Sequence, residues 1–376
     1  MNLCFNCSLR TPSHSTVVIW VKKYGLFQML RQQSKADDWV VIIDESVHFG
    51  QNKLLLVYGI RQSEVDFTRT LHFNDLTPMV LMSRASWTGE CIKQQLEILE
   101  QRFGKIMYAV AHQGNPIKKA LKTKGIQHVY DITHCISLIV EHIYKEDTEF
   151  VGYTRKMAKL RGAQALGKMS HVLPPTQRVN ARFMNLRPIS DWGMAVLNLL
   201  ENGPAYLSKE KHYLAWVSTY QRLIKELWLL NEMINKIQSI LKSRGLSKET
   251  ANSCAQILEK ANTEKLKRFK NDLIRYFEDT FTGKGHKQIS QLLCSSDIIE
   301  SAFGKYKNYL QANSMVGITN LSLSLAAFTG QHTGEEIKDA LQTVQINKVQ
   351  SWTNENIGPT TLSKRKQVLK WNENSN

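Results

Sequence analysis

The chain has 376 residues, of which 42% are hydrophobic, so it is long enough for two or three domains with substantial cores. Its formal net charge of +16 favours a polyanionic partner, most simply nucleic acid. No apolar run approaches the ~20 residues of a membrane span. The N-terminus lacks the charged start and long apolar core of a signal peptide. We therefore expect a cytoplasmic protein that associates with the nucleoid.

The N-terminal segment is expected to form one helix within residues 11–31, because serines near its start can cap it and apolar residues recur at helical spacing. Gly25 is expected to end this helix. A capped helix with Lys22 and Lys23 near its end is typical of a DNA-recognition helix. Too few residues precede it for a complete module, so we interpret residues 1–33 as the remnant of a DNA-binding helix-turn-helix.

From residue 39 the pattern changes to three apolar strands, followed by alternating helices and strands as far as residue 146. The β-branched residues of the first strand run straight into Asp44. Three antiparallel strands followed by this alternation are the order of a ribonuclease-H-like sheet, which other α+β folds share. Residues 39–146 are therefore interpreted as the first part of a ribonuclease-H-like core.

The strand signal disappears at about residue 147, and residues 147–294 are basic and helical in pattern. Residues 295–330 contain a capped helix that carries Glu300, followed by a last apolar helix. Residues 331–376 end in a basic and then polar stretch, and are expected to form a partly flexible tail. The predicted fold class is α+β, with a mixed sheet interrupted by a large all-α insertion.

Three carboxylates stand where a predicted strand ends or a capped helix begins, namely Asp44, Asp131 and Glu300. A buried strand has no structural use for an unpaired charge, because burying one is expensive. Phosphoryl transfer with two divalent ions uses such a set, since hard carboxylate oxygens hold Mg²⁺ or Mn²⁺. We therefore predict that Asp44, Glu300 and Asp131 are catalytic ligands of two Mg²⁺ or Mn²⁺ ions.

Each carboxylate also has a purely structural interpretation. Asp44 could close a hairpin turn. Asp131 stands before a helix, where Asp is a common N-cap. Glu300 could be a solvated first-turn residue that the helix dipole favours. His134, one helical turn after Asp131, is either a ligand or phosphate contact, or a core residue of an apolar helix.

Four segments, taken in order, resemble the DDE transposases of bacterial insertion sequences. They are VIIDESVHFGQNKLLL at 41–56, VYDITH at 129–134, ARFMNL at 181–186 with Trp192, and SSDIIESAFGKYK at 295–307. The resemblance covers the chain from about residue 39 to 330. It implies a ribonuclease-H-like catalytic domain with Asp44 as the first acid and Glu300 as the third. It also implies that residues 147–294 are the insertion found before the last acid in many such enzymes.

The activity that this resemblance implies is cleavage of phosphodiester bonds at element ends, which frees a 3′-hydroxyl that attacks target DNA. The partner would be double-stranded DNA, bound by a homodimer. Basic side chains in the matching regions are candidates for phosphate contacts; they are Arg182, Lys305, Lys307, Lys159 and Arg161.

One departure from the family pattern concerns the second acid. Similar transposases have Ser-Asp-Gln-Gly or a close variant at the end of the fourth strand, whereas this chain has AHQG at 111–114. His112 therefore fills the second-acid position, and imidazole is a poor ligand for Mg²⁺. The second acid is missing unless Asp131 serves. The alternative function is therefore a catalytically inactive, truncated transposase copy that binds DNA or represses an intact transposase.

Overall fold

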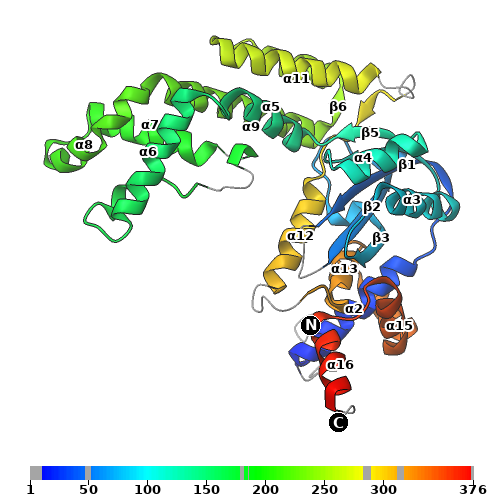
Figure 1. Ribbon diagram of the computed structural model, residues 1–376. Coiled ribbons are helices and arrows are strands. Elements are labelled where there is room, and N and C mark those ends of the chain that lie inside the picture. Colours follow the sequence, from blue (N-terminus) through cyan, green and yellow to red (C-terminus); the bar gives the residue numbers. More distant parts are fainter. Residues whose placement is uncertain are drawn as a thin grey trace. The chain divides into compact units, whose positions relative to one another are not determined.

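The structure is a computed structural model that describes residues 11–46, 52–177, 182–184, 186–282, 289–310 and 317–373 (Figure 1). The chain divides into two compact units. The first, here called the sheet unit, contains Met1–Asp66, Thr70–Val129 and Ser296–Asn376, and the second, the helical unit, contains Phe67–Arg69 and Tyr130–Ser295. In the described ranges, no helix is both long and apolar enough to cross a lipid bilayer.

The sheet unit is built on a five-stranded mixed sheet with the strand order β3-β2-β1-β4-β5. Its central strand β1 pairs antiparallel with β2 and parallel with β4, and β2 pairs antiparallel with β3. The predicted α+β class with a mixed sheet is confirmed. The strands are β1 (Ala36–Glu45), β2 (Lys53–Arg61), β3 (Thr77–Arg84), β4 (Gly104–Ala111) and β5 (Gln127–Tyr130).

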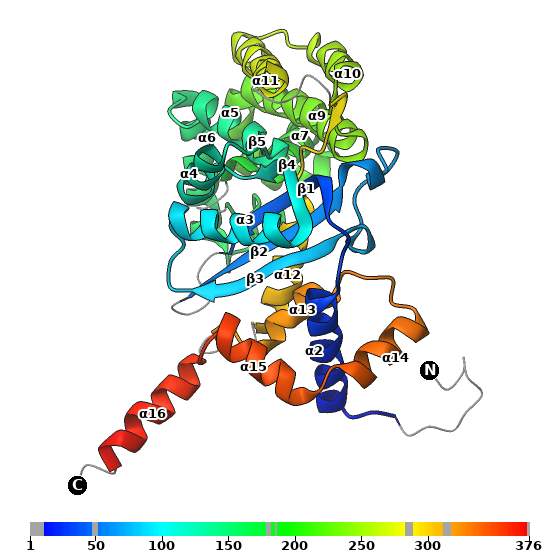
Figure 2. The ribbon, with the colours of Figure 1, turned by 90° about the vertical axis from the view of Figure 1, so that its right-hand side faces the viewer.

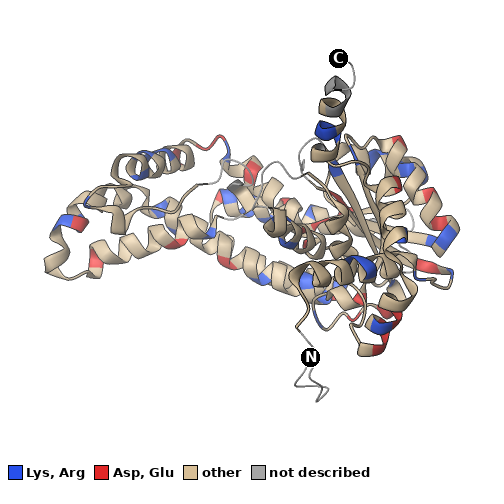
Figure 3. Ribbon diagram, turned by 90° about the horizontal axis from the view of Figure 1, so that it is seen from below, with Lys and Arg blue, Asp and Glu red and all other residues tan. Residues whose placement is uncertain are grey.

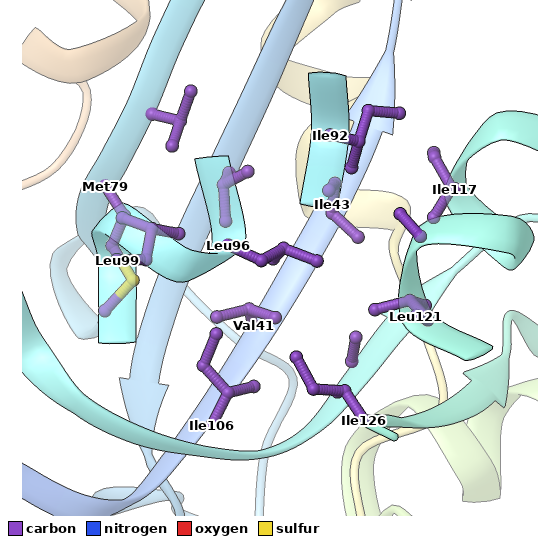
Figure 4. Packing of buried hydrophobic residues seen from close by; sticks show 14 of the residues in the cluster. Val41, Ile43, Met79, Ile92, Leu96, Leu99, Ile106, Ile117, Leu121 and Ile126 are labelled. Atoms are coloured by element: carbon purple, nitrogen blue, oxygen red, sulfur yellow. The ribbon is translucent and has the colours of Figure 1, made fainter. Parts of the chain in front are cut away.

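One face of this sheet is covered by α3 (Gly89–Phe103) and α4 (Asn115–Lys124). Val41 and Ile43 of β1 point to this face, because side chains two apart in a strand share a side. They pack among Ile92 and Leu96 of α3 and Leu121 of α4, as Figure 4 shows. The helix predicted over residues 89–103 is confirmed at both ends.

The opposite face of the sheet carries α12 (Asp297–Leu310), which contacts β1, and α13 (Leu323–Ala327). Tyr58 of β2 is fully buried, and its hydroxyl donates to the Leu325 carbonyl of α13 at 2.7 Å. Ile42 stands directly opposite Tyr58, so Ile42 and Asp44 also point to this face. Figures 1 and 2 show α3 and α12 on opposite sides of the sheet.

The N-terminal helix α2 (His14–Leu30) is capped by Ser13, as predicted, and packs against α13. Gly25 does not end this helix, which continues for five further residues to Leu30. A β-carbon at Gly25 would lie 2.0 Å from the Leu323 carbonyl oxygen. The glycine therefore permits close helix–helix contact, and this is why the prediction of a helix end at Gly25 is wrong.

The segment 331–376, predicted to be a partly flexible tail, contains three helices, α14 (Gly334–Thr343), α15 (Ile346–Asn356) and α16 (Thr361–Glu373). The first two pack against α2. Lys23 of α2 donates to the Leu341 carbonyl of α14 at 2.9 Å. Apolar packing of Tyr24 with Ala327 and Ala340 supplies the burial that makes these polar helices stable in place.

The Glu336 carboxylate of α14 is the main polar link between the two ends of the sheet unit. Four groups donate to it at 2.6–3.0 Å, namely Tyr24 Oη, Gln28 Nε2, Arg31 Nη1 and the His332 N–H. Partial burial acts to raise the pKa of Glu336, but the hydrogen bonds from Tyr24 and Gln28, followed by the other donors, hold this pKa below its usual value.

The helical unit contains helices that pack around α9, whose Leu223, Leu227 and Leu230 are buried as predicted. α5, α7 and α10 contact α9, and α11 contacts α5. A small two-stranded sheet joins β6 to β7. The elements are α5 (Ile132–Tyr144), α6 (Thr148–Gln164), α7 (Arg187–Asn202), α8 (Ser208–Leu214), α9 (Gln221–Arg244), β6 (Leu246–Ser247), α10 (Lys248–Leu258), α11 (Glu264–Thr282) and β7 (Gln291–Leu292).

Replacement of Gly25 by Ala is expected to destabilise the protein by about 1–3 kcal/mol, because the added methyl group overlaps the Leu323 carbonyl. Gly304→Ala is the matched control, since a β-carbon there meets nothing within 4 Å in helix α12. That change should be neutral or stabilise by up to about 1 kcal/mol. Thermal melting of both variants tests this, and equal melting temperatures would contradict it.

Glu336→Gln is expected to lower stability at pH 7 by about 1–3 kcal/mol, because the donors around this carboxylate lose its charge. The pKa of Glu336 is depressed in the folded state, so its contribution is present above the unfolded pKa of about 4.3 and is lost as pH falls through the folded pKa. The gap in melting temperature from wild type should therefore close in acid.

The matched control is Glu335→Gln, which removes an exposed carboxylate from the same first turn of α14. It should change the melting temperature less at pH 7. A gap for Glu336→Gln that stays constant from pH 7 to pH 3 would refute the electrostatic account of this link.

Candidate functional site

Asp44 lies on the central strand β1, one residue before its end, and directly opposite Leu56 of β2. The hairpin is closed by its neighbour Ser46, whose N–H donates to the Leu54 carbonyl at 2.8 Å and whose Oγ accepts from the Leu54 N–H at 3.0 Å. The turn-closing role that the sequence left open for Asp44 therefore belongs to Ser46. Glu45 points to the other face, where its Oε1 pairs with Lys53 at 3.1 Å.

His112 follows β4 directly and lies beside Asp44. The parallel register sets Ile42 opposite Val110, so two residues further on each strand the side chains of Asp44 and His112 meet on the same face. His112 Nδ1 lies 3.0 Å from Asp44 Oδ1. The side chains are 26% and 20% exposed respectively, so the pair is accessible to solvent and to small ions.

Two residues that the sequence interpretation missed fix the position of His112. His128 of β5 donates from Nε2 to the Ala111 carbonyl at 3.1 Å, since a carbonyl only accepts. Burial lowers the pKa of His128, although this hydrogen bond acts in the opposite direction, so the ring is neutral at pH 7. A β-carbon at Gly114 would lie 2.6 Å from His112 Nε2, so the absence of a side chain there leaves room for the ring.

The signals for these two residues differ in kind. Gly114 stands before Asn115-Pro116 at the start of α4, a turn pattern that can be read from the sequence. His128 acts across a strand pair, and nothing in its local sequence indicates its partner.

Glu300 lies in the first turn of α12, and its residue is half-buried. The helix packs through Ile299 and Phe303, which are buried, and α12 contacts β1. The sheet unit therefore contains Asp44, His112 and Glu300, as the sequence predicts for the first acid, the degenerate position and the third acid. The favourable interaction of Glu300 with the helix dipole applies as well.

Asp131 belongs to the helical unit and is fully buried. It is the N-cap of α5, where its Oδ1 accepts from the His134 N–H at 2.8 Å and lies 3.0 Å from His134 Nδ1. The structural interpretation of Asp131 as a cap is thus observed. Its role as a metal ligand stays a prediction.

The donor atoms at the candidate site decide which metal ion fits. Within the described ranges, no group of three or more His, Cys, Asp or Glu side chains is gathered closely enough to hold a metal ion. The closest pair at the predicted site is one carboxylate oxygen, from Asp44, and one imidazole nitrogen, from His112. Mg²⁺ takes oxygen ligands, whereas imidazole suits transition metals, so this pair does not fit Mg²⁺.

The basic residues predicted to contact DNA have different environments, and Figure 3 shows Lys and Arg on both units, interspersed with acidic residues. Lys305 Nζ lies over the Phe73 and Phe328 rings at 4.4 and 5.1 Å. Arg161 donates to the Pro174 carbonyl at 2.7 Å. Lys159 is exposed on α6 and Lys307 is half-buried on α12, while the side chain of Arg182 lies outside the described residues.

Comparison with known proteins gives little beyond these observations. No protein-family model matches the sequence, and no curated protein matches it. Among solved structures, the chain is similar to the Drosophila P element transposase strand transfer complex, with 11% identity and a TM-score of 0.46 over 89% of each chain. Similarity of this degree assigns neither a family nor a function.

Lys305→Ala is expected to lower stability by about 0.5–1 kcal/mol, because its ammonium group loses attraction to two aromatic rings that belong to the same unit. Lys338→Ala is the control, since Lys338 is an exposed lysine of α14 in that unit. Urea denaturation compares the two. Equal midpoints would show that Lys305 gains nothing from the aromatic pair, and its assignment as a DNA contact would be strengthened.

Proposed function

We propose that this chain is a DNA transposase of the DDE type, similar to those of bacterial insertion sequences, and that it cleaves phosphodiester bonds at element ends and transfers the strands to target DNA. Divalent ions, Mg²⁺ or Mn²⁺, would activate the attacking group and stabilise the leaving oxygen. A homodimer would bind the double-stranded DNA. The large basic excess of the chain supports a nucleic-acid partner.

The observation that carries this proposal is the placement of three sequence-distant segments in one unit. The end of β1 carries Asp44, the adjacent end of β4 leads into His112, and α12, which contacts β1, carries Glu300. The strand order β3-β2-β1-β4-β5, with β1 antiparallel to β2 and parallel to β4, supports a ribonuclease-H-like arrangement. Asp44 and Glu300 would hold the ions, and Asp131 is proposed as the remaining acid.

A second candidate function is favoured by His112. A neutral imidazole stands where the resemblance implies a second carboxylate, 3.0 Å from Asp44. With one carboxylate fewer, the site carries less negative charge to bind Mg²⁺. The alternative is therefore a catalytically inactive copy that binds DNA or represses an intact transposase.

The test is strand-nicking of a DNA duplex that carries the sequences flanking this reading frame, with Mg²⁺ or with Mn²⁺. Asp44→Asn and Glu300→Gln are each expected to lower the nicking rate by on the order of 100-fold or more, because each removes charge stabilisation at the reacting phosphate. Asp37→Asn is the matched control, since Asp37 is exposed on the same strand β1. It should keep wild-type activity.

The outcomes separate the two candidates. Nicking that survives both site substitutions would refute the assignment of Asp44 and Glu300. A wild type that binds DNA in a salt-sensitive way without nicking, together with recovery of nicking in His112→Asp, would establish the inactive copy. A chain that does not bind DNA at low salt would rule out both functions.

A further inference from the structure

We infer that Asp44 and His112 form a binding site for an octahedral divalent transition-metal ion, of the Mn²⁺, Co²⁺ or Ni²⁺ class, in preference to Mg²⁺. The inference deepens the proposed function, on which its catalytic meaning rests, because it names the ion that this site selects. The binding step itself follows from the pair of side chains alone.

The separation of the two donor atoms matches neighbouring ligands on one octahedral ion. Two ligands about 2.1 Å from an ion and at right angles to one another are about 3.0 Å apart. His112 Nδ1 and Asp44 Oδ1 are 3.0 Å apart. Two ligands on a tetrahedral ion at that bond length would be about 3.4 Å apart, so the geometry favours octahedral ions over Zn²⁺.

The chemistry of the donors selects within the octahedral ions. Affinity for sites with nitrogen and oxygen ligands rises from Mn²⁺ through Co²⁺ to Ni²⁺, whereas Mg²⁺ prefers oxygen alone. Two protein ligands are sufficient for an ion that acts on nucleic acid, since water and substrate phosphates complete the coordination. The partial exposure of both side chains leaves the outer positions open to these ligands.

The imidazole is held ready for this role before any ion binds. The pairing of β1 with β4 fixes the two backbones, and His128 anchors the Ala111 carbonyl just before His112. Gly114 leaves room for Nε2 on the far side of the ring, so that Nδ1 is the atom presented to Asp44. Pre-organised ligands lose less conformational freedom on binding.

Two further histidine–carboxylate pairs show what distinguishes this one. His134 Nδ1 also lies 3.0 Å from Asp131 Oδ1, but Asp131 is fully buried and the same oxygen caps α5, so water cannot complete a coordination shell there. His171 Nε2 lies 3.4 Å from Glu210 Oε1, and His171 is 57% exposed on the surface. The Asp44–His112 pair alone among these three combines the octahedral distance with access.

The experiment measures metal binding without DNA, using untagged full-length protein titrated with Mg²⁺, Mn²⁺, Co²⁺ and Ni²⁺. Calorimetry gives the affinities, and the visible absorption of Co²⁺ reports its coordination. All proteins carry Cys4→Ser and Cys7→Ser, because a Cys-x-x-Cys pair is itself a metal ligand. The variants are His112→Ala, His112→Asp, Asp44→Asn and Gly114→Ala, with His171→Ala and His134→Ala as controls.

We expect affinity to rise in the order Mg²⁺, Mn²⁺, Co²⁺, Ni²⁺. His112→Ala and Asp44→Asn should each weaken Co²⁺ binding at least about tenfold, and Gly114→Ala should weaken it by displacing the ring without removing a ligand. His112→Asp should shift the preference towards Mg²⁺ by a similar factor. The control substitutions should leave the affinities unchanged.

The inference is overturned if Co²⁺ binds no more tightly than Mg²⁺, or if His134→Ala rather than His112→Ala abolishes binding. This readout is independent of nicking. Selective Co²⁺ binding with no nicking in any metal would refute the proposed activity and leave the ion site standing, whereas nicking that is supported equally by Mg²⁺ and Mn²⁺ and is unaffected by His112→Ala would refute the ion site and leave the activity standing.

Discussion

The sheet unit depends on the position of β1 between β2 and β4. Because β1 is hydrogen-bonded on both edges and covered on both faces, its middle residues are apolar and fully buried. Polar chemistry is then restricted to the strand ends, and the register with β4 determines what faces Asp44. Moving β4 by one residue would turn His112 to the other face. The candidate site is therefore as well defined as the strand pairing that creates it.

Much of this arrangement could be predicted from local sequence. The five strands and the helix over 89–103 follow from apolar periodicity, and Asp44 stood out as a carboxylate at the end of a buried run. Long-range contacts could not be predicted in this way. Gly25 looks like a helix terminator until Leu323, far along the chain, is seen to pack against it. Similarly, the link from Glu336 to Tyr24 joins residues whose local sequences carry no sign of one another.

Asp44 and Asp131 show how one residue type takes different roles through its surroundings. Both stand at the ends of strands, yet Asp131 is sealed from solvent and spends its oxygen on a helix cap, whereas Asp44 keeps solvent access beside an imidazole. Arg161 and Lys305 make the same point for cations, since one holds a carbonyl and the other lies on aromatic rings. Net charge thus describes the molecule better than it describes any single basic side chain.

The sheet unit is assembled from separate stretches of chain, with almost the whole helical unit encoded between Val129 and Ser296. During synthesis the ribosome therefore releases the helical unit before α12, α13 and α14 exist. Until Glu336 emerges, α2 lacks both its polar clamp and its apolar cover, and the face of the sheet that bears Asp44 stays open. A ribosome that stops early thus yields a chain with a complete helical unit and an unfinished site, so the last-made part of the polypeptide decides when the first-made helix can settle.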